Sequence, residues 1–81
     1  MPEIRATVHA AVGLHARPAA QFTKAAAAVP GDVAVIRDGH EANAKSMLSV
    51  LALNVRHGDT ITLRADDEHA LSELKRVVER L

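Results

Sequence analysis

The spacing of apolar residues switches along this chain between every second residue and every third or fourth residue. In the first segment Ile4, Ala6 and Val8 alternate with polar residues, which is typical of a strand with one buried face. Alternating or β-branched runs predict four strands, over residues 3–9, 33–37, 40–43 and 60–65. A chain that mixes both spacings is expected to pack helices against a sheet.

The remaining apolar segments predict three helices, over residues 16–28, 46–53 and 66–81. The last of them carries one apolar stripe, formed by Leu71, Leu74, Val78 and Leu81. Acidic residues begin this helix and basic residues end it, as the helix dipole favours. Ser46 is predicted to cap the middle helix, because its hydroxyl can accept a hydrogen bond from a free backbone N–H.

Turn residues separate these segments. Pro30 and Gly31 end the first helix, and Asp38 and Gly39 predict a two-residue hairpin because both can take a positive φ. The order is strand, helix, strand, strand, helix, strand, helix. The predicted fold class is α/β (α+β), a two-layer open-faced sandwich in which three helices cover one face of a four-stranded antiparallel sheet.

Composition narrows the classes of function. The 81 residues predict a single domain over 1–81, with Phe22 as the only aromatic residue of its core. Ten basic residues balance ten acidic ones, so there is no basic stripe for nucleic acid. The chain has no cysteine, no visible signal peptide and no long apolar run, so we expect a cytoplasmic protein without disulfides, thiolate metal site or membrane insertion.

The segment GLHARPAA places a histidine and an arginine just before a predicted helix. Pro18 suits the first helical turn, where its missing N–H costs nothing. The free N–H groups of Ala16 and Arg17, together with the helix dipole, predict an anion site. Arg17 adds a forked cation suited to phosphate oxygens. Gly13 is expected to give the preceding loop backbone freedom and to remove side-chain bulk from the approach to this site.

A nucleophile at this place favours phosphoryl transfer. Neutral imidazole is available near physiological pH, so His15 could accept a phosphoryl group that the helix end and Arg17 then stabilise. The alternative is an ordinary surface histidine. The chain has four other histidines, His9, His40, His57 and His69. None of the five has the spacing of metal ligands, so no metal site is predicted.

The stretch GLHARPAAQF resembles the active-site segment of the HPr family, the histidine phosphocarriers of the bacterial phosphoenolpyruvate:sugar phosphotransferase system. DGHEANAKSML and HGDTITL are also similar to that family, so the resemblance covers essentially the whole chain. It implies that enzyme I phosphorylates Nδ1 of His15 and that the group passes to sugar-specific enzyme IIA components in sugar transport. Arg17 would be the phosphate partner. Such a protein is a phosphocarrier, not a turnover enzyme, and needs no cofactor.

The segment AKSML resembles the regulatory stretch of the same family. There the serine that corresponds to Ser46 is phosphorylated by an HPr kinase/phosphorylase in some bacteria. The helix over 46–53 can bury only one of its apolar faces, so we expect some of Met47, Leu48 and Leu51 to be exposed as a partner-docking surface. Asn54 replaces a glycine common in relatives, and asparagine tolerates the left-handed conformation.

Two rival functions remain open at this point. One is a regulatory phosphorelay paralogue of the nitrogen-type branch, which would share the same site. The other is a small protein-binding module with no phosphoryl chemistry. In either case we expect a monomer with protein partners.

Overall fold

The computed structural model describes residues 2–81 and contains four strands and three helices in the predicted order. The elements are β1 (Glu3–Thr7), α1 (Ala16–Ala27), β2 (Ala34–Arg37), β3 (His40–Asn43), α2 (Met47–Ala52), β4 (Thr60–Arg64) and α3 (Glu68–Arg80). Every predicted element is present, and no end of an element differs from its predicted position by more than two residues.

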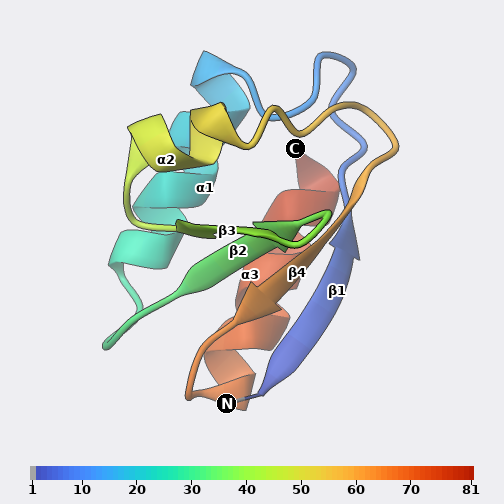
Figure 1. Cartoon of the computed structure of the whole chain (residues 1–81). Coiled ribbons are helices and arrows are strands. Elements are labelled where there is room, and N and C mark those ends of the chain that lie inside the picture. Colours follow the sequence, from blue (N-terminus) through green and yellow to red (C-terminus); the bar gives the residue numbers. More distant parts are fainter. Residues whose placement is uncertain (1) are drawn as a thin grey trace.

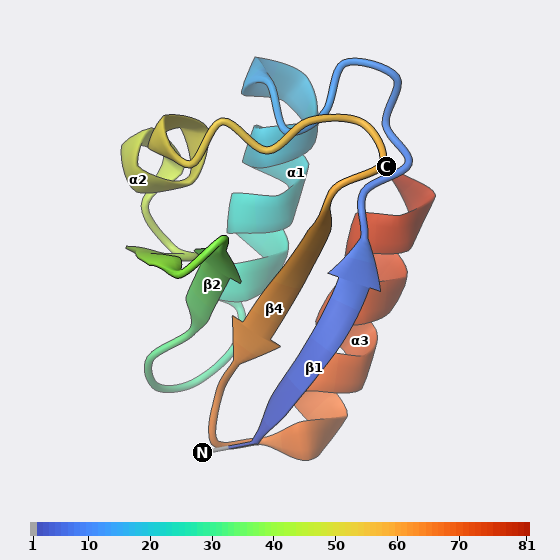
Figure 2. The ribbon, with the colours of Figure 1, turned by 45° about the vertical axis from the view of Figure 1, so that its right-hand side comes forward.

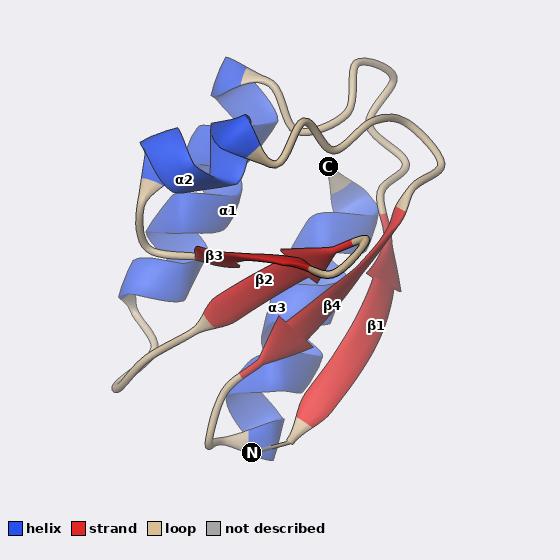
Figure 3. Cartoon of the chain, viewed as in Figure 1, coloured by secondary structure: helices blue, strands red, loops and turns tan. Residues whose placement is uncertain are grey.

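The strands form one antiparallel sheet in the order β1-β4-β2-β3. The three helices lie on one side of this sheet, which confirms the open-faced sandwich (Figures 1 and 3). α3 packs against β1 and β4 and lies behind β1 in Figure 2, whereas α1 contacts both α2 and α3. The register pairs Ala6 with Ile61 and Val35 with Leu63, so the buried apolar residues of neighbouring strands share the helix-covered face.

The core lies between the sheet and the helices. Phe22 of α1 is fully buried, and so are Ile61 and Leu63 of β4. The predicted stripe of α3 is buried at Leu71, Leu74 and Val78, while Leu81 packs only partly against the core. The alternation of β4 and the helical spacing of α3 therefore direct their apolar side chains as the sequence predicts.

Several elements are shorter than predicted. β1 ends at Thr7 because Val8 pairs with a turn instead: its N–H donates to the carbonyl of Asp59 at 2.9 Å and its carbonyl accepts from Gly58 at 2.8 Å. α1 ends at Ala27, so Val29 lies outside the helix but is still buried. β2 begins at Ala34 instead of residue 33, and β4 ends at Arg64 instead of residue 65.

The predicted turns and caps are present. Asp38 and Gly39 have φ values of 50° and 78°, as a two-residue hairpin requires. Asn54 has a φ of 55° after α2. The Ser46 hydroxyl accepts a hydrogen bond from the Ser49 N–H at 3.3 Å, so it caps α2 as predicted.

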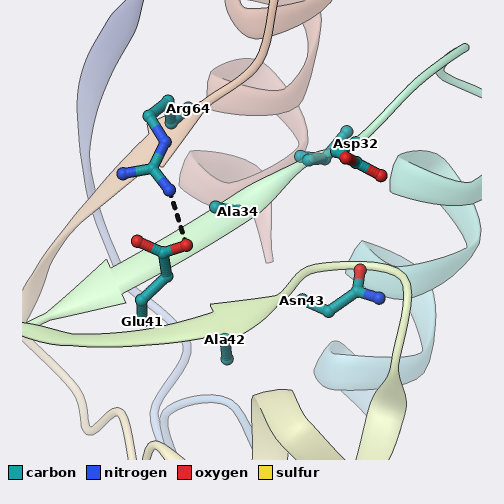
Figure 4. Close-up of a pocket in the computed structure, with 7 residues that line it drawn as sticks. Asp32, Ala34, Glu41, Ala42, Asn43 and Arg64 are labelled. Atoms are coloured by element: carbon teal, nitrogen blue, oxygen red, sulfur yellow. Dashed lines mark ion pairs between the residues drawn. The ribbon is translucent and has the colours of Figure 1, made fainter. Parts of the chain in front are cut away.

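An ion pair crosses the open face of the sheet. Arg64 of β4 reaches over β2 to Glu41 of β3, and the small side chain of Ala34 leaves room for it (Figure 4). The hydrogen bond to Glu41 raises the pKa of the Arg64 guanidinium above its usual value. Asp32 and Asn43 border the same shallow hollow. The pair ties three strands together on the face opposite the helices.

Phe22→Ala should be strongly destabilising, because it removes the one aromatic side chain of the core. Such truncations cost about 3–5 kcal/mol, a large share of the stability of a small domain. Urea unfolding followed by circular dichroism measures the change. Leu48→Ala, at a residue that is 82% exposed, is the control and should stay within about 0.5 kcal/mol of the wild type. Equal midpoints for both variants would contradict the described core.

Candidate functional site

His15 is the N-cap residue of α1. Its backbone is extended, with φ −84° and ψ −173°, and its carbonyl accepts a hydrogen bond from the Ala19 N–H at 2.7 Å. Its imidazole makes no capping hydrogen bond, and the residue is exposed. The backbone of His15 therefore starts the helix while its ring stays free for chemistry.

Two free backbone donors adjoin His15. Ala16 and Arg17 are the first helical residues, so their N–H groups have no acceptor within α1. Pro18 carries no N–H, and the next donor, Ala19, is already bonded to His15. No acidic residue lies in the first turn of α1 to compete for these donors. The arrangement fits an anion with several oxygens.

Arg17 is exposed at the same helix end. Within residues 2–81 no carboxylate forms an ion pair with its guanidinium. The forked donor is therefore available for an external anion. The structure thus brings together the predicted site residues His15, Ala16 and Arg17 at one helix terminus.

The loop before His15 packs along the loop between α2 and β4. Both loops lie side by side at the upper end of the molecule in Figures 1 and 2, drawn in blue and in yellow to orange. The Leu14 N–H donates to the carbonyl of Val55 at 3.0 Å. The Gly13 N–H donates to the carbonyl of Ala10 at 2.9 Å, which closes a turn just ahead of the site.

Gly13 is the point of closest approach between these loops. It is buried and has a φ of +70°. A Cβ at this position would lie 2.3 Å from the carbonyl oxygen of Val55 and 2.6 Å from the Cα of Arg56. The positive φ confirms the expected backbone freedom, but the space that the missing side chain leaves is filled by the chain's own backbone and is not room for an incoming group.

Asp59 holds the second loop in shape. One oxygen of its carboxylate accepts hydrogen bonds from the Arg56 N–H and from the Arg37 Nε, both at 2.9 Å. These two hydrogen bonds, with that of Arg56 the stronger influence, hold the pKa of the Asp59 carboxyl below its usual value. Arg37 also donates to the carbonyl of Leu53 at 3.3 Å. The sequence indicated only a turn at Gly58 and Asp59, and the contribution of Arg37 was missed.

The expected docking residues of α2 differ in exposure. Leu48 is 82% exposed, whereas Met47 and Leu51 are half-buried and Leu51 packs partly against the core. The expectation that some of these residues are exposed is therefore confirmed at Leu48, whereas their part in docking stays a prediction. Val12, three residues before His15, is 62% exposed, and the sequence did not single it out as a contact residue.

Residues 2–81 contain no group of three or more His, Cys, Asp or Glu side chains that could hold a metal ion. None of the helices in the described chain combines the length and the apolar character that a membrane crossing needs.

The chain is similar to known phosphocarriers along most of its length. A family model described as the PTS HPr component phosphorylation site matches residues 2–80. The phosphocarrier protein HPr of Streptomyces coelicolor is 45% identical over 78 residues, covering 95% of this chain and 84% of that protein. The HPr of Mycoplasma genitalium is 33% identical over 84 residues, with 99% and 96% covered. The crystal structure of an HPr from Bacillus anthracis superimposes with a TM-score of 0.86 at 35% identity, covering 95% of each chain.

Gly13→Ala should destabilise the protein more than Gly58→Ala. Both glycines have positive φ, so alanine costs about 1–2 kcal/mol of backbone strain at either position. At Gly58 a Cβ meets nothing within 4 Å, whereas at Gly13 it overlaps the backbone of the neighbouring loop. Thermal unfolding measures the difference, at about 4–8 °C for each kcal/mol in a domain of this size. Equal melting temperatures would contradict the close approach of the two loops.

Proposed function

This chain belongs to the HPr family of phosphocarrier proteins, and from that premise we propose that it accepts a phosphoryl group from enzyme I on Nδ1 of His15 and passes it to enzyme IIA domains. The observation that carries the proposal is the surroundings of the imidazole. An exposed ring with no capping role adjoins two backbone N–H groups that have no acceptor within α1, and a guanidinium that no carboxylate of residues 2–81 pairs with.

The proposed transfer is a direct displacement at phosphorus. The lone pair of His15 Nδ1 attacks phosphorus while the bond from phosphorus to the donor atom of phosphorylated enzyme I breaks, and that atom keeps the electron pair. The transferred group carries its negative charge to the end of α1, where the N–H groups of Ala16 and Arg17 and the Arg17 guanidinium stabilise it. Phosphoryl transfer depends mainly on such positioning and charge.

The same groups suit a carrier that must give the phosphoryl group away again. His15, Ala16 and Arg17 are all exposed, so water screens the attraction between the phosphoryl group and its donors. The stabilisation is therefore moderate, and a partner that offers another phosphoryl acceptor can compete. The protein acts as a substrate of its partners, and a cytoplasmic monomer meets that role.

Leu48 and Ser46 supply the proposed docking and regulatory features. Leu48 presents an exposed apolar side chain on α2, a helix that packs against α1. Met47 and Leu51 contribute the exposed parts of their side chains to the same surface. Ser46 caps this helix, and a phosphate placed there by a kinase would add about two negative charges beside the docking surface.

Replacement of His15 tests the function most simply. After incubation with phosphoenolpyruvate and enzyme I, the intact mass of the wild type should rise by one acid-labile phosphoryl group. His15→Ala should gain none, because the acceptor nitrogen is gone. His69→Ala, an exposed histidine of α3, is the matched control and should gain one group. A phosphorylated His15→Ala protein would rule out the assignment.

Arg17→Ala should slow the transfer but leave the fold intact. The guanidinium is exposed and unpaired within residues 2–81, so the urea midpoint should stay near that of the wild type. Loss of a charge-assisted contact to the moving group should reduce the transfer rate by about tenfold or more. The transfer rate of Arg17→Lys should lie between those of the wild type and Arg17→Ala, since lysine keeps the charge but lacks the forked donor. A wild-type rate for Arg17→Ala would remove this residue from the site.

Leu48→Asp and Ser46→Asp should both slow phosphorylation of His15 by enzyme I while the far-ultraviolet circular dichroism stays native. The first change puts a charge into the apolar docking surface, and the second imitates part of the charge of phosphoserine. Ser72→Asp adds the same charge to an exposed position on α3 and serves as the control. Rates equal to that of Ser72→Asp in both variants would show that α2 is not the docking surface.

A further inference from the structure

His57 lies in the loop between α2 and β4 and touches the loop that leads to His15. Its Nδ1 is 3.1 Å from the carbonyl oxygen of His9 and 3.3 Å from that of Ala10. Carbonyl oxygens only accept hydrogen bonds, so Nδ1 must carry the hydrogen. The neutral ring is therefore held as the Nδ1–H tautomer, and protonation of Nε2 leaves this donor in place.

The carbonyl of Ala10 is part of the turn just ahead of the site. It also accepts the Gly13 N–H at 2.9 Å, and the next residue, Leu14, donates to the carbonyl of Val55 at 3.0 Å. His57 thus fixes the first residue of the turn and Val55 fixes the residue after it. His57 and Val55 belong to the same loop. The carboxylate of Asp59 holds this loop in shape, because it accepts hydrogen bonds from the Arg56 N–H and from Arg37.

We infer that His57 is a positioning residue for phosphoryl acceptance at His15. It acts through the hydrogen bonds that its Nδ1–H donates to the carbonyls of His9 and Ala10, which together form what we call the Nδ1–H clasp. This inference rests on the proposed function. His57 does not touch the transferred group. It limits the positions that the turn over residues 10–13 can take, and through that turn it limits the orientation of the N-cap residue at the start of α1.

Such a clasp can improve the orientation of His15 toward the phosphoryl donor. A shift of about 1 Å in a reacting group can cost roughly a hundredfold in rate. A loop held at one end only would sample more positions than a loop held at both ends. Loss of the clasp should therefore lower the rate of transfer within the complex more than the affinity for enzyme I.

Three variants of His57 show whether the transfer rate depends on the hydrogen-bond donor or on the shape of the side chain. His57→Asn places an amide N–H at the position of Nδ1, and His57→Leu keeps the bulk without a donor. His57→Gln carries its donor one bond farther out, at the position of Nε2. His69→Leu, at an exposed histidine on α3, controls for the loss of a histidine elsewhere.

Single-turnover transfer from phosphorylated enzyme I gives the maximal rate and the half-saturating concentration for each variant. We expect His57→Leu and His57→Gln to lower the maximal rate by about tenfold, with a half-saturating concentration within about twofold of the wild type. His57→Asn and His69→Leu should keep the wild-type rate. The final extent of labelling should be one phosphoryl group in every case.

A second measurement does not depend on transfer. Long-range nitrogen–proton NMR of the unphosphorylated protein, at a pH where the ring is neutral, should show His57 as the Nδ1–H tautomer. The Nε2–H tautomer would overturn the clasp. Because this spectrum needs only the wild type, it tests the Nδ1–H clasp even if His57→Leu does not fold. In that case the transfer rates of His57→Asn and His57→Gln are compared instead.

The kinetic outcomes separate this inference from the proposed function. A folded His57→Leu protein with the wild-type rate would overturn the positioning role while leaving His15 as the acceptor. A His57→Asn protein as slow as His57→Leu would overturn the role of the Nδ1 donor in the same way. A wild type that takes no phosphoryl group would overturn the proposed function itself, and the positioning role with it.

Discussion

The approach of Gly13 to the backbone of Val55 and Arg56 is the constraint on which the site depends. A Cβ at Gly13 would overlap that backbone at 2.3 Å, so only glycine lets the two loops meet. Their contact fixes where the chain turns into α1. The start of α1 in turn makes His15 an N-cap residue and leaves the N–H groups of Ala16 and Arg17 without acceptors within the helix.

The site is therefore built mostly from main-chain groups, and the rest of the fold serves to hold them. Phe22 and the buried residues of β4 and α3 anchor α1 against the sheet. Arg37 of β2 holds both ends of the loop over residues 53–59, because it donates to the carbonyl of Leu53 and to the carboxylate of Asp59. In the proposed site the side chains that would meet the anion are the imidazole of His15 and the guanidinium of Arg17, and both are exposed.

Much of the fold follows from local pattern, whereas the loop contacts do not. Period-two alternation and helical spacing predict the seven elements, and Asp38 with Gly39 predicts the hairpin, because each signal depends on neighbours in sequence. The ion pair of Arg37 with Asp59 joins residues 22 apart, and His57 reaches back 47 residues to Ala10. Such contacts have no local signal. Helical spacing also left open which apolar residues of α2 turn outward, and the structure shows that Leu48 does while Met47 and Leu51 are half-buried.

Nitrogen–proton NMR of the protein before and after phosphorylation by phosphoenolpyruvate and enzyme I tests the central claim directly. The account predicts that the phosphoryl group resides on Nδ1 of His15 and that the amide protons of Ala16 and Arg17 move downfield as they donate to its oxygens. Attachment to Nε2, attachment to another histidine, or unmoved amides at Ala16 and Arg17 would contradict it.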